Sequence, residues 1–126
     1  TGEIAGVHNT DFDFTDPRAV PTDVTLDANF CLSQVLHSKP EFAARLAVPS
    51  GPQLEIHTTE PGLQIYNGTG LQDTDTPMHP GQQLGPCAGI ALEPQRWPDA
   101  PSHDSFPGIL MPAGALYRQV TRYAFA

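Results

Sequence analysis

One carboxylate at the end of a short apolar run is the feature of this sequence best suited to chemistry. Residues 89–92 are apolar, Glu93 follows them and Pro94 comes next. Proline has no N–H and a fixed φ, so we expect the β-ladder to end at Pro94 and Glu93 to lie at the mouth of a strand. An amide, a guanidinium and an indole follow in Gln-Arg-Trp (95–97). Such groups bind sugar hydroxyls and cover the C–H face of a pyranose, so the stretch predicts a sugar-binding edge. The alternative is a solvated surface glutamate.

Length and charge narrow the class of protein. The 126 residues suit one domain, and 14 Asp and Glu against 6 Lys and Arg give a net charge of −8. This balance argues against a nucleic-acid partner, because phosphate contacts need clustered cations, and against binding to anionic membranes. No apolar run is long enough to span a bilayer, and no signal peptide is visible. We expect a cytoplasmic protein.

The cysteines and histidines suggest structural roles. Cys31 and Cys87 lie in apolar, strand-like runs, which predicts that both are buried free thiols. The alternative is a disulfide between them. No pair has His-x-x-x-His or Cys-x-x-Cys spacing, so we expect no metal site. The five histidines are expected to be structural or solvated, with two in strand-like runs and three in polar loops: His8 and His57, then His37, His79 and His103.

Short apolar runs between Pro- and Gly-rich turns predict an all-β fold. No stretch suggests an amphipathic helix of ten or more residues, and 67–86 is expected to be a long loop. The clearest hairpin joins 42–48 to 53–59 through Pro-Ser-Gly-Pro (49–52). The other expected strands are a short one around Phe12 and Phe14, then 26–36, 63–66, 89–92, 108–111 and 116–125, the last two joined by a turn at 112–115.

Five segments, in order along essentially the whole chain, resemble the C-terminal part of the aldose 1-epimerase family. The resemblance lies in the combination, because no single motif would be specific. The segments are Val-His-Asn-Thr-Asp-Phe-Asp-Phe (7–14), Leu-Asp-Ala-Asn-Phe (26–30), Thr-Thr-Glu-Pro-Gly-Leu-Gln-Ile-Tyr (58–66), Leu-Glu-Pro-Gln-Arg-Trp-Pro-Asp-Ala-Pro-Ser (92–102) and the closing stretch 112–125. Some positions depart from the family pattern, such as Asp11 where proline is usual and Leu26 and Ala28 where tyrosine and histidine are usual.

The resemblance implies the C-terminal part of a galactose-mutarotase-like β-supersandwich, with residues 1–126 as one segment of a single domain. It implies an enzyme that interconverts the α and β anomers of free hexoses such as galactose and glucose, without a cofactor. Glu93 falls on the family's general base, which should be partly desolvated and have a raised pKa. Asp27 and Gln64 fall on positions that bind sugar hydroxyls.

The family's general acid, a histidine, lies in an N-terminal portion that has no counterpart in this sequence. The chain also starts at Thr1 directly in a family motif, which predicts that it begins within a longer protein. The expected partners are therefore a monosaccharide and the N-terminal portion of the same enzyme, as a separate chain or segment.

Two other functions stay open. A non-catalytic carbohydrate-binding or assembly module could retain this part of the fold without the acid. An epimerase of phosphorylated sugars ranks lower, because the six Lys and Arg residues are scattered along the chain and make a poor anion site.

Overall fold

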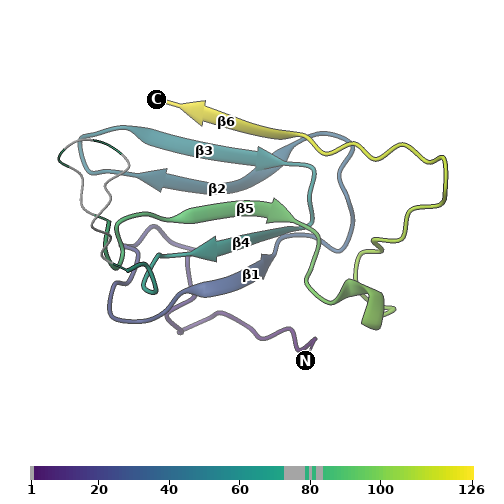
Figure 1. Ribbon diagram of the computed structural model, residues 1–126, viewed down its shortest axis with the longest axis horizontal. Coiled ribbons are helices and arrows are strands. Elements are labelled where there is room, and N and C mark those ends of the chain that lie inside the picture. The colour runs from purple at the N-terminus through teal and green to yellow at the C-terminus, as the bar shows by residue number, and fades with distance from the viewer. Residues whose placement is uncertain (1, 73–78, 80, 82–83) are drawn as a thin grey trace. The chain divides into compact units, whose positions relative to one another are not determined.

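A computed structural model describes residues 2–72, 79, 81 and 84–126 of the chain. Among these residues the secondary structure is almost entirely β, which confirms the predicted fold class (Figure 1). The single helix found there is a three-residue 3₁₀ turn, so the expected absence of long helices holds for the described part. The elements are β1 (Asp27–Cys31), β2 (Glu41–Ala47), β3 (Gln53–Thr58), β4 (Gly62–Tyr66), β5 (Ala91–Gln95), η1 (Ala100–Ser102) and β6 (Thr121–Phe125).

The strands form two three-stranded sheets, in the orders β1-β4-β5 and β2-β3-β6. The chain also divides into two compact units, and the boundary between them falls within β1, β4 and β5. Unit 1 comprises 1–2, 29–63 and 94–126, and unit 2 comprises 3–28 and 64–93. The sheet β2-β3-β6 lies wholly in unit 1.

The predicted hairpin is confirmed as the antiparallel pair β2–β3. Leu46 lies opposite Leu54 and Ala44 opposite Ile56, with an irregularity between Phe42 and Ala44. Because side chains alternate across a strand, this register puts these four apolar side chains on one face. Ile56 is fully buried there, as the pattern of alternating apolar residues requires.

Several expected strands are shorter than predicted or absent. No strand forms around Phe12 and Phe14, where hydrogen bonds from Thr15 and Asn9 to Asp13 hold a turn. β1 ends at Cys31, because the next two amides, of Leu32 and Ser33, both donate to the carbonyl of Pro61.

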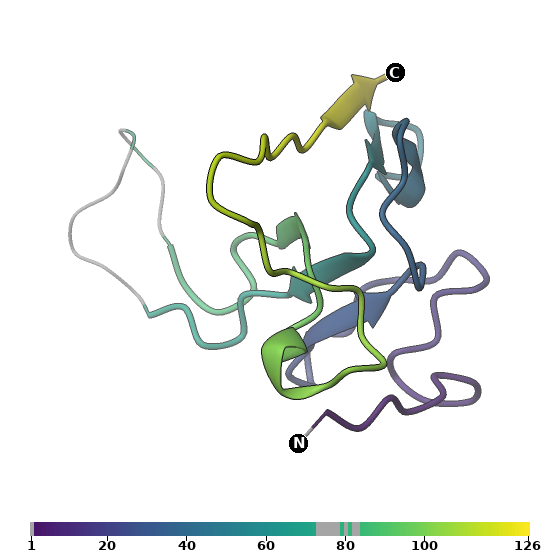
Figure 2. The same cartoon turned by 90° about the vertical axis from the view of Figure 1, so that its right-hand side faces the viewer.

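The largest difference lies in the segment before β6. The predicted strand 108–111 is wrong, and the predicted strand 116–125 forms only over its second half, as β6. The chain runs without strand from η1 to Thr121 (Figure 2). The predicted turn between them does form, with the Ala115 amide donating to the Pro112 carbonyl over 3.0 Å and Gly114 at φ 82°. Residues 108–111 and 116–120 are of types that are common in strands, but a strand also needs a neighbouring strand with which its backbone can form hydrogen bonds.

Few apolar side chains are buried among the described residues. They are Ile56, Leu63, Trp97 and Ala100 in unit 1 and Leu26 in unit 2. Of the expected loop 67–86, residues 73–78, 80, 82 and 83 lie outside the described residues, and the others form no strand. Among the described residues, no helix is long and apolar enough to cross a bilayer.

Candidate functional site

Asp27 and Gln64 lie side by side in unit 2. Asp27 begins β1 and Gln64 is the middle residue of β4, the neighbouring strand. The Gln64 side-chain amide donates to Asp27 Oδ1 over 2.6 Å. Asp27 is exposed and Gln64 half-buried, so their remaining polar atoms can bind a hydroxyl-rich ligand. The structure therefore brings together the two residues that the resemblance implied as sugar-binding.

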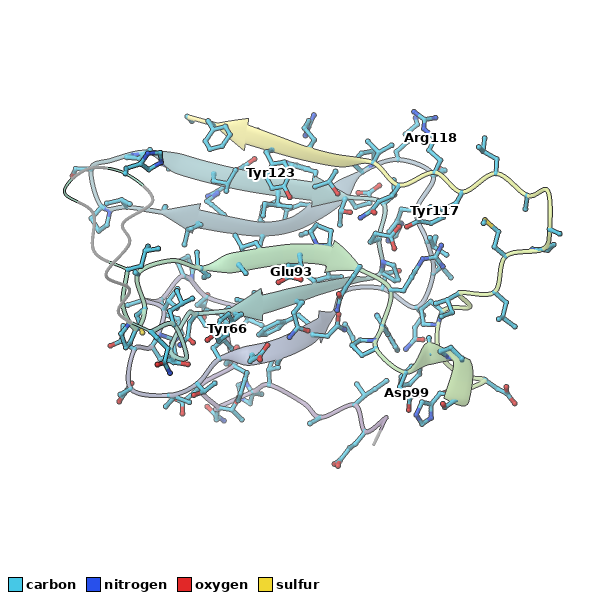
Figure 3. All side chains as sticks on the ribbon, in the orientation of Figure 1. Tyr66, Glu93, Asp99, Tyr117, Arg118 and Tyr123 are labelled. Carbon is cyan, nitrogen blue, oxygen red and sulfur yellow. The ribbon has the colours of Figure 1, made fainter. Side chains whose placement is uncertain are left out.

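Glu93 is directed to the same face of this sheet. On β5 its side chain alternates with that of Pro94 and shares a face with Gln95. Gln95 Nε2 donates to Asn29 Oδ1 over 3.2 Å, so these two side chains lie on the same face of the sheet. Asp27 is two residues before Asn29 on β1, and its side chain therefore projects from that face too. Figure 3 labels Glu93 on its strand. Three groups expected to contact a sugar thus project from one face.

Two local expectations about Glu93 are wrong. β5 continues through Pro94 to Gln95, so Glu93 lies inside a strand and not at its mouth. Proline is tolerated because β5 is an edge strand in the order β1-β4-β5, where one side of the backbone needs no ladder partner. Glu93 is also exposed, so the partial desolvation implied for a general base is absent here.

Asn67 holds the segment that leads into Asp27, whereas the sequence analysis placed it only at the start of the loop 67–86. It is 3% exposed. Its side chain accepts a hydrogen bond from the Leu26 amide and donates to the carbonyls of Pro21 and Val24, over 3.2, 2.8 and 2.8 Å. Its own amide donates to the Leu26 carbonyl over 3.0 Å. The end of β4 is thereby tied to the segment that enters β1. The sequence offers only an Asn-Gly pair at 67–68, which is typical of a turn and does not indicate burial.

The prediction that Trp97 covers a pyranose is wrong, because its indole is buried inside the protein. Trp97 is 3% exposed, donates through Nε1 to the Pro61 carbonyl over 2.8 Å and packs edge-on against Phe106. No indole face is free for a pyranose. Gly62 makes room for this packing: a Cβ there would lie 2.7 Å from Asn29 Oδ1 and 3.0 Å from Trp97 Cδ1.

Glu60 forms a buried ion pair with Arg96. Its side chain is fully buried, and Oε2 lies 3.0 Å from Nε of Arg96. The Tyr117 hydroxyl donates to Oε1 over 3.1 Å, and Arg96 also donates to the Gly108 carbonyl. Burial, and then the negative charge of Glu60, raise the pKa of Tyr117. Sequence reasoning missed Glu60, because nothing in a Thr-Thr-Glu-Pro-Gly turn indicates that its carboxylate is buried.

The thiols and histidines take structural or surface positions. Both cysteines are free, as predicted, and Cys31 is the last residue of β1. The predicted burial is wrong, because Cys31 is exposed and Cys87 is half-buried, in a turn at φ 60° and not in a strand. His57 is on β3 as expected, 3.4 Å from Glu55, whereas His8 lies in a turn and not in a strand. Within the described ranges, no three His, Cys, Asp or Glu side chains gather as metal ligands would.

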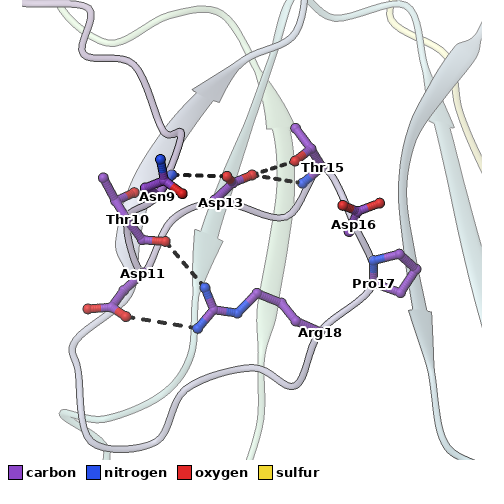
Figure 4. Close-up of a pocket in the computed structure, with 8 residues that line it drawn as sticks. All are labelled: Asn9, Thr10, Asp11, Asp13, Thr15, Asp16, Pro17 and Arg18. Atoms are coloured by element: carbon purple, nitrogen blue, oxygen red, sulfur yellow. Dashed lines mark hydrogen bonds and ion pairs between the residues drawn. The ribbon is translucent and has the colours of Figure 1, made fainter.

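A hollow of about 460 Å³ lies over the loop 9–18 in unit 2 (Figure 4). Its polar groups bind one another. Asp13 accepts hydrogen bonds from the Thr15 hydroxyl, the Thr15 amide and the Asn9 amide, which together lower its pKa. Arg18 donates to the Thr10 carbonyl and lies 3.9 Å from Asp11. These contacts stabilise the turn.

Sequence comparison relates this all-β chain to a known protein family. The chain matches the aldose 1-epimerase family over residues 1–124. It is therefore a member of the aldose 1-epimerase family.

Its similarity to individual members is moderate and extends along the whole chain. It is 36% identical to galactose mutarotase from Rattus norvegicus and 35% identical to galactose mutarotase from Homo sapiens, in both cases over 133 aligned positions that cover all of this chain. It is 32% identical to aldose 1-epimerase from Haemophilus influenzae, over 94% of this chain. The chain spans 38%, 38% and 37% of the length of these three relatives.

Proposed function

We propose that this chain forms the C-terminal part of an aldose 1-epimerase that interconverts the α and β anomers of free hexoses such as galactose and glucose. The supporting observation is the contact of Gln64 with Asp27 on the sheet face that also bears Glu93. In this proposal residues 1–126 belong to a single β-sandwich domain, which an N-terminal portion completes.

Glu93 acts as the general base. Its carboxylate takes the proton of the anomeric hydroxyl while an acid protonates the ring oxygen, and the bond between C1 and the ring oxygen breaks to give the open aldehyde. After rotation about the C1–C2 bond the ring oxygen attacks the other face of C1. The protons then return along the same two routes, so no net atom is gained or lost and no cofactor is needed.

Asp27 and Gln64 hold the sugar. A carboxylate accepts hydrogen bonds from two hydroxyls, and an amide both donates and accepts, so together they fix the position of a pyranose ring. The contact between them fixes both side chains before the sugar arrives, which lowers the entropy lost on binding.

The N-terminal portion supplies a histidine as the general acid and completes the site. It would also cover Glu93, which is exposed in this chain, and raise the basicity that a general base needs. We place the enzyme in the cytoplasm, where two free thiols are expected to stay reduced.

The test is mutarotation of α-galactose followed by polarimetry, in the enzyme as isolated with its N-terminal portion. Glu93→Gln should lower kcat by about 10²–10⁴-fold. Glu55→Gln, the same change at a strand carboxylate on the other sheet, is the matched control and should leave kcat unchanged. Wild-type mutarotation by Glu93→Gln would refute the assignment.

The second candidate function is a carbohydrate-binding module without catalysis, which the exposure of Glu93 favours for the chain by itself. The isolated 126-residue chain should then bind galactose without changing the rate of mutarotation. Denaturing mass spectrometry of native material separates the two candidates. A second polypeptide in equal amount, or one longer chain, supports the enzyme, and a lone 13.6 kDa chain supports the module.

A further inference from the structure

The side chains of Asn29 and Gln95 meet although their strands are not neighbours. Asn29 is on β1 and Gln95 is on β5, and β4 lies between these strands in the order β1-β4-β5. Strands separated by one other strand are about 10 Å apart, which is too far for most side chains to touch across the strand between them. Gln95 Nε2 nevertheless donates to Asn29 Oδ1 over 3.2 Å. We call this contact the amide bridge.

Gly62 on β4 makes room for the amide bridge. A Cβ at this buried position would lie 2.7 Å from Asn29 Oδ1 and 3.0 Å from Asn29 Nδ2. The φ of Gly62 lies outside the left-handed region, so the position requires glycine for its small size and not for its backbone conformation. Any other residue here would displace the Asn29 side chain, so the bridge crosses the central strand where a side chain is missing.

The amide bridge lies next to the proposed sugar site along all three strands. Two residues from each of these positions, on the same strand, is one of the residues proposed to contact the sugar: Asp27, Gln64 and Glu93. Because side chains alternate, all three project from the face that carries the bridge. The contact of Gln64 with Asp27 joins β4 to β1, whereas the bridge joins β5 directly to β1.

Exposure separates the side chains that support the site from those that can contact a ligand. Asp27 and Glu93 are exposed, whereas Asn29 and Gln95 are half-buried and bind each other. β5 is also an edge strand, so a ladder holds its backbone on one side only. A side-chain bond from this strand to β1 therefore restricts the position of the carboxylate that β5 carries.

We infer that the amide bridge positions the general base. Asn29 and Gln95 fix β5, which carries Glu93, relative to β1, and they do so without contacting the sugar. The inference rests on the proposed function, in which Glu93 is the base and Asp27 binds the sugar. Proton transfer depends more steeply on the position of the base than binding does, so loss of the bridge lowers kcat more than it changes KM.

The test is the kinetics of galactose mutarotation in the enzyme with its N-terminal portion. Gln95→Met keeps the length of the side chain, removes the amide donor and should lower kcat about tenfold. KM should stay within about twofold, because the contact of Gln64 with Asp27 is retained. Gln53→Met, the same change at an exposed residue of β3, is the matched control and should change neither constant. An unchanged kcat would overturn the inference, as would a rise in KM alone, which indicates direct contact with the sugar.

A double-mutant cycle separates the amide bridge from two independent structural roles. Asn29→Leu should lower kcat by about the same factor as Gln95→Met, and the double variant should be no slower than either, because one bond is lost in all three. Circular dichroism first checks that each variant is folded at the assay temperature. Losses that multiply in the double variant would contradict a shared role.

Glu93→Gln in the same assay distinguishes failure of this inference from failure of the proposed function. Wild-type mutarotation by Glu93→Gln would refute the proposed function. Loss of activity in Glu93→Gln together with normal kcat in Gln95→Met would refute the role of the amide bridge alone.

Discussion

The side-chain amide of Gln64 donates to the carboxylate of Asp27 over 2.6 Å, across the neighbouring strands β4 and β1. Residues 37 positions apart in sequence thereby meet on one sheet face. The contact combines a carboxylate and an amide, which is the pair of groups that a sugar-binding surface needs.

The first prediction concerns this pair. Asp27→Asn should raise KM for galactose about 10–100-fold, because a hydrogen bond from a sugar hydroxyl to a charged group contributes about 1.5–3 kcal/mol. Gln64→Glu should also raise KM, since it puts a second carboxylate beside Asp27. The combination Asp27→Asn with Gln64→Glu restores one amide and one carboxylate and should recover part of the loss. Polarimetry over a range of sugar concentrations measures this. Unchanged KM in both single variants would exclude the pair from sugar binding.

The second prediction concerns the buried ion pair of Glu60 and Arg96. Glu60→Gln should destabilise the chain by about 3 kcal/mol, at the low end for breaking a buried pair, because the Arg96 side chain is still 22% exposed. Glu60→Leu with Arg96→Met should recover most of this loss. Glu55→Gln breaks the exposed pair with Arg45 and should have a much smaller effect. Urea denaturation measures all three, and equal losses at positions 60 and 55 would contradict the prediction.

The third prediction tests the structural role of Trp97. Trp97→Phe removes the indole donor to Pro61 and should cost about 1 kcal/mol of stability, because that carbonyl keeps its hydrogen bonds from Leu32 and Ser33. Trp97→Ala should cost about 3–5 kcal/mol. Because the indole is buried, KM for galactose in Trp97→Phe should equal that of the wild type. A rise in KM with unchanged stability would instead support an indole that contacts sugar.

The fourth prediction concerns the acid stability of unit 2. Hydrogen bonds from Thr15 and Asn9 lower the pKa of Asp13 below 3.8, its ordinary value. The unfolded state therefore takes up this proton first, so the stabilisation is present above about pH 4 and is lost as the pH falls through the folded pKa. Thr15→Val removes the strongest donor and should raise the pKa of Asp13 towards 3.8, as measured by NMR titration of its carboxyl carbon. An unchanged titration midpoint would show that the hydroxyl has no such effect.

The fifth prediction concerns Asn67. Asn67→Ala removes three side-chain hydrogen bonds from a buried site and should destabilise unit 2 by about 2–4 kcal/mol. Hydrogen exchange of the amides between Pro21 and Asp27 should accelerate, while the amides of β3 should keep their rates. Uniform acceleration along the whole chain would indicate global destabilisation without a specific role in holding the entry to β1.

Sequence reasoning worked where a local pattern was sufficient. The apolar alternation around Pro-Ser-Gly-Pro predicted the β2–β3 hairpin, because turn residues and a period of two together fix both the turn and the face that is buried. It failed at 108–120, where the same kind of pattern gives no strand, because pairing depends on a neighbour that may lie anywhere in the protein.

Residue types alone determined that this protein is all-β, acidic and related to the aldose 1-epimerases, and they pointed to Asp27, Gln64 and Glu93. Only the tertiary structure decided what the neighbouring residues do. It buried Trp97, paired Arg96 with the buried Glu60 and left Glu93 exposed. The reason is physical: burial and partner choice arise from contacts between segments far apart in the chain, such as Glu60 with Arg96, whereas sequence patterns report only on neighbours.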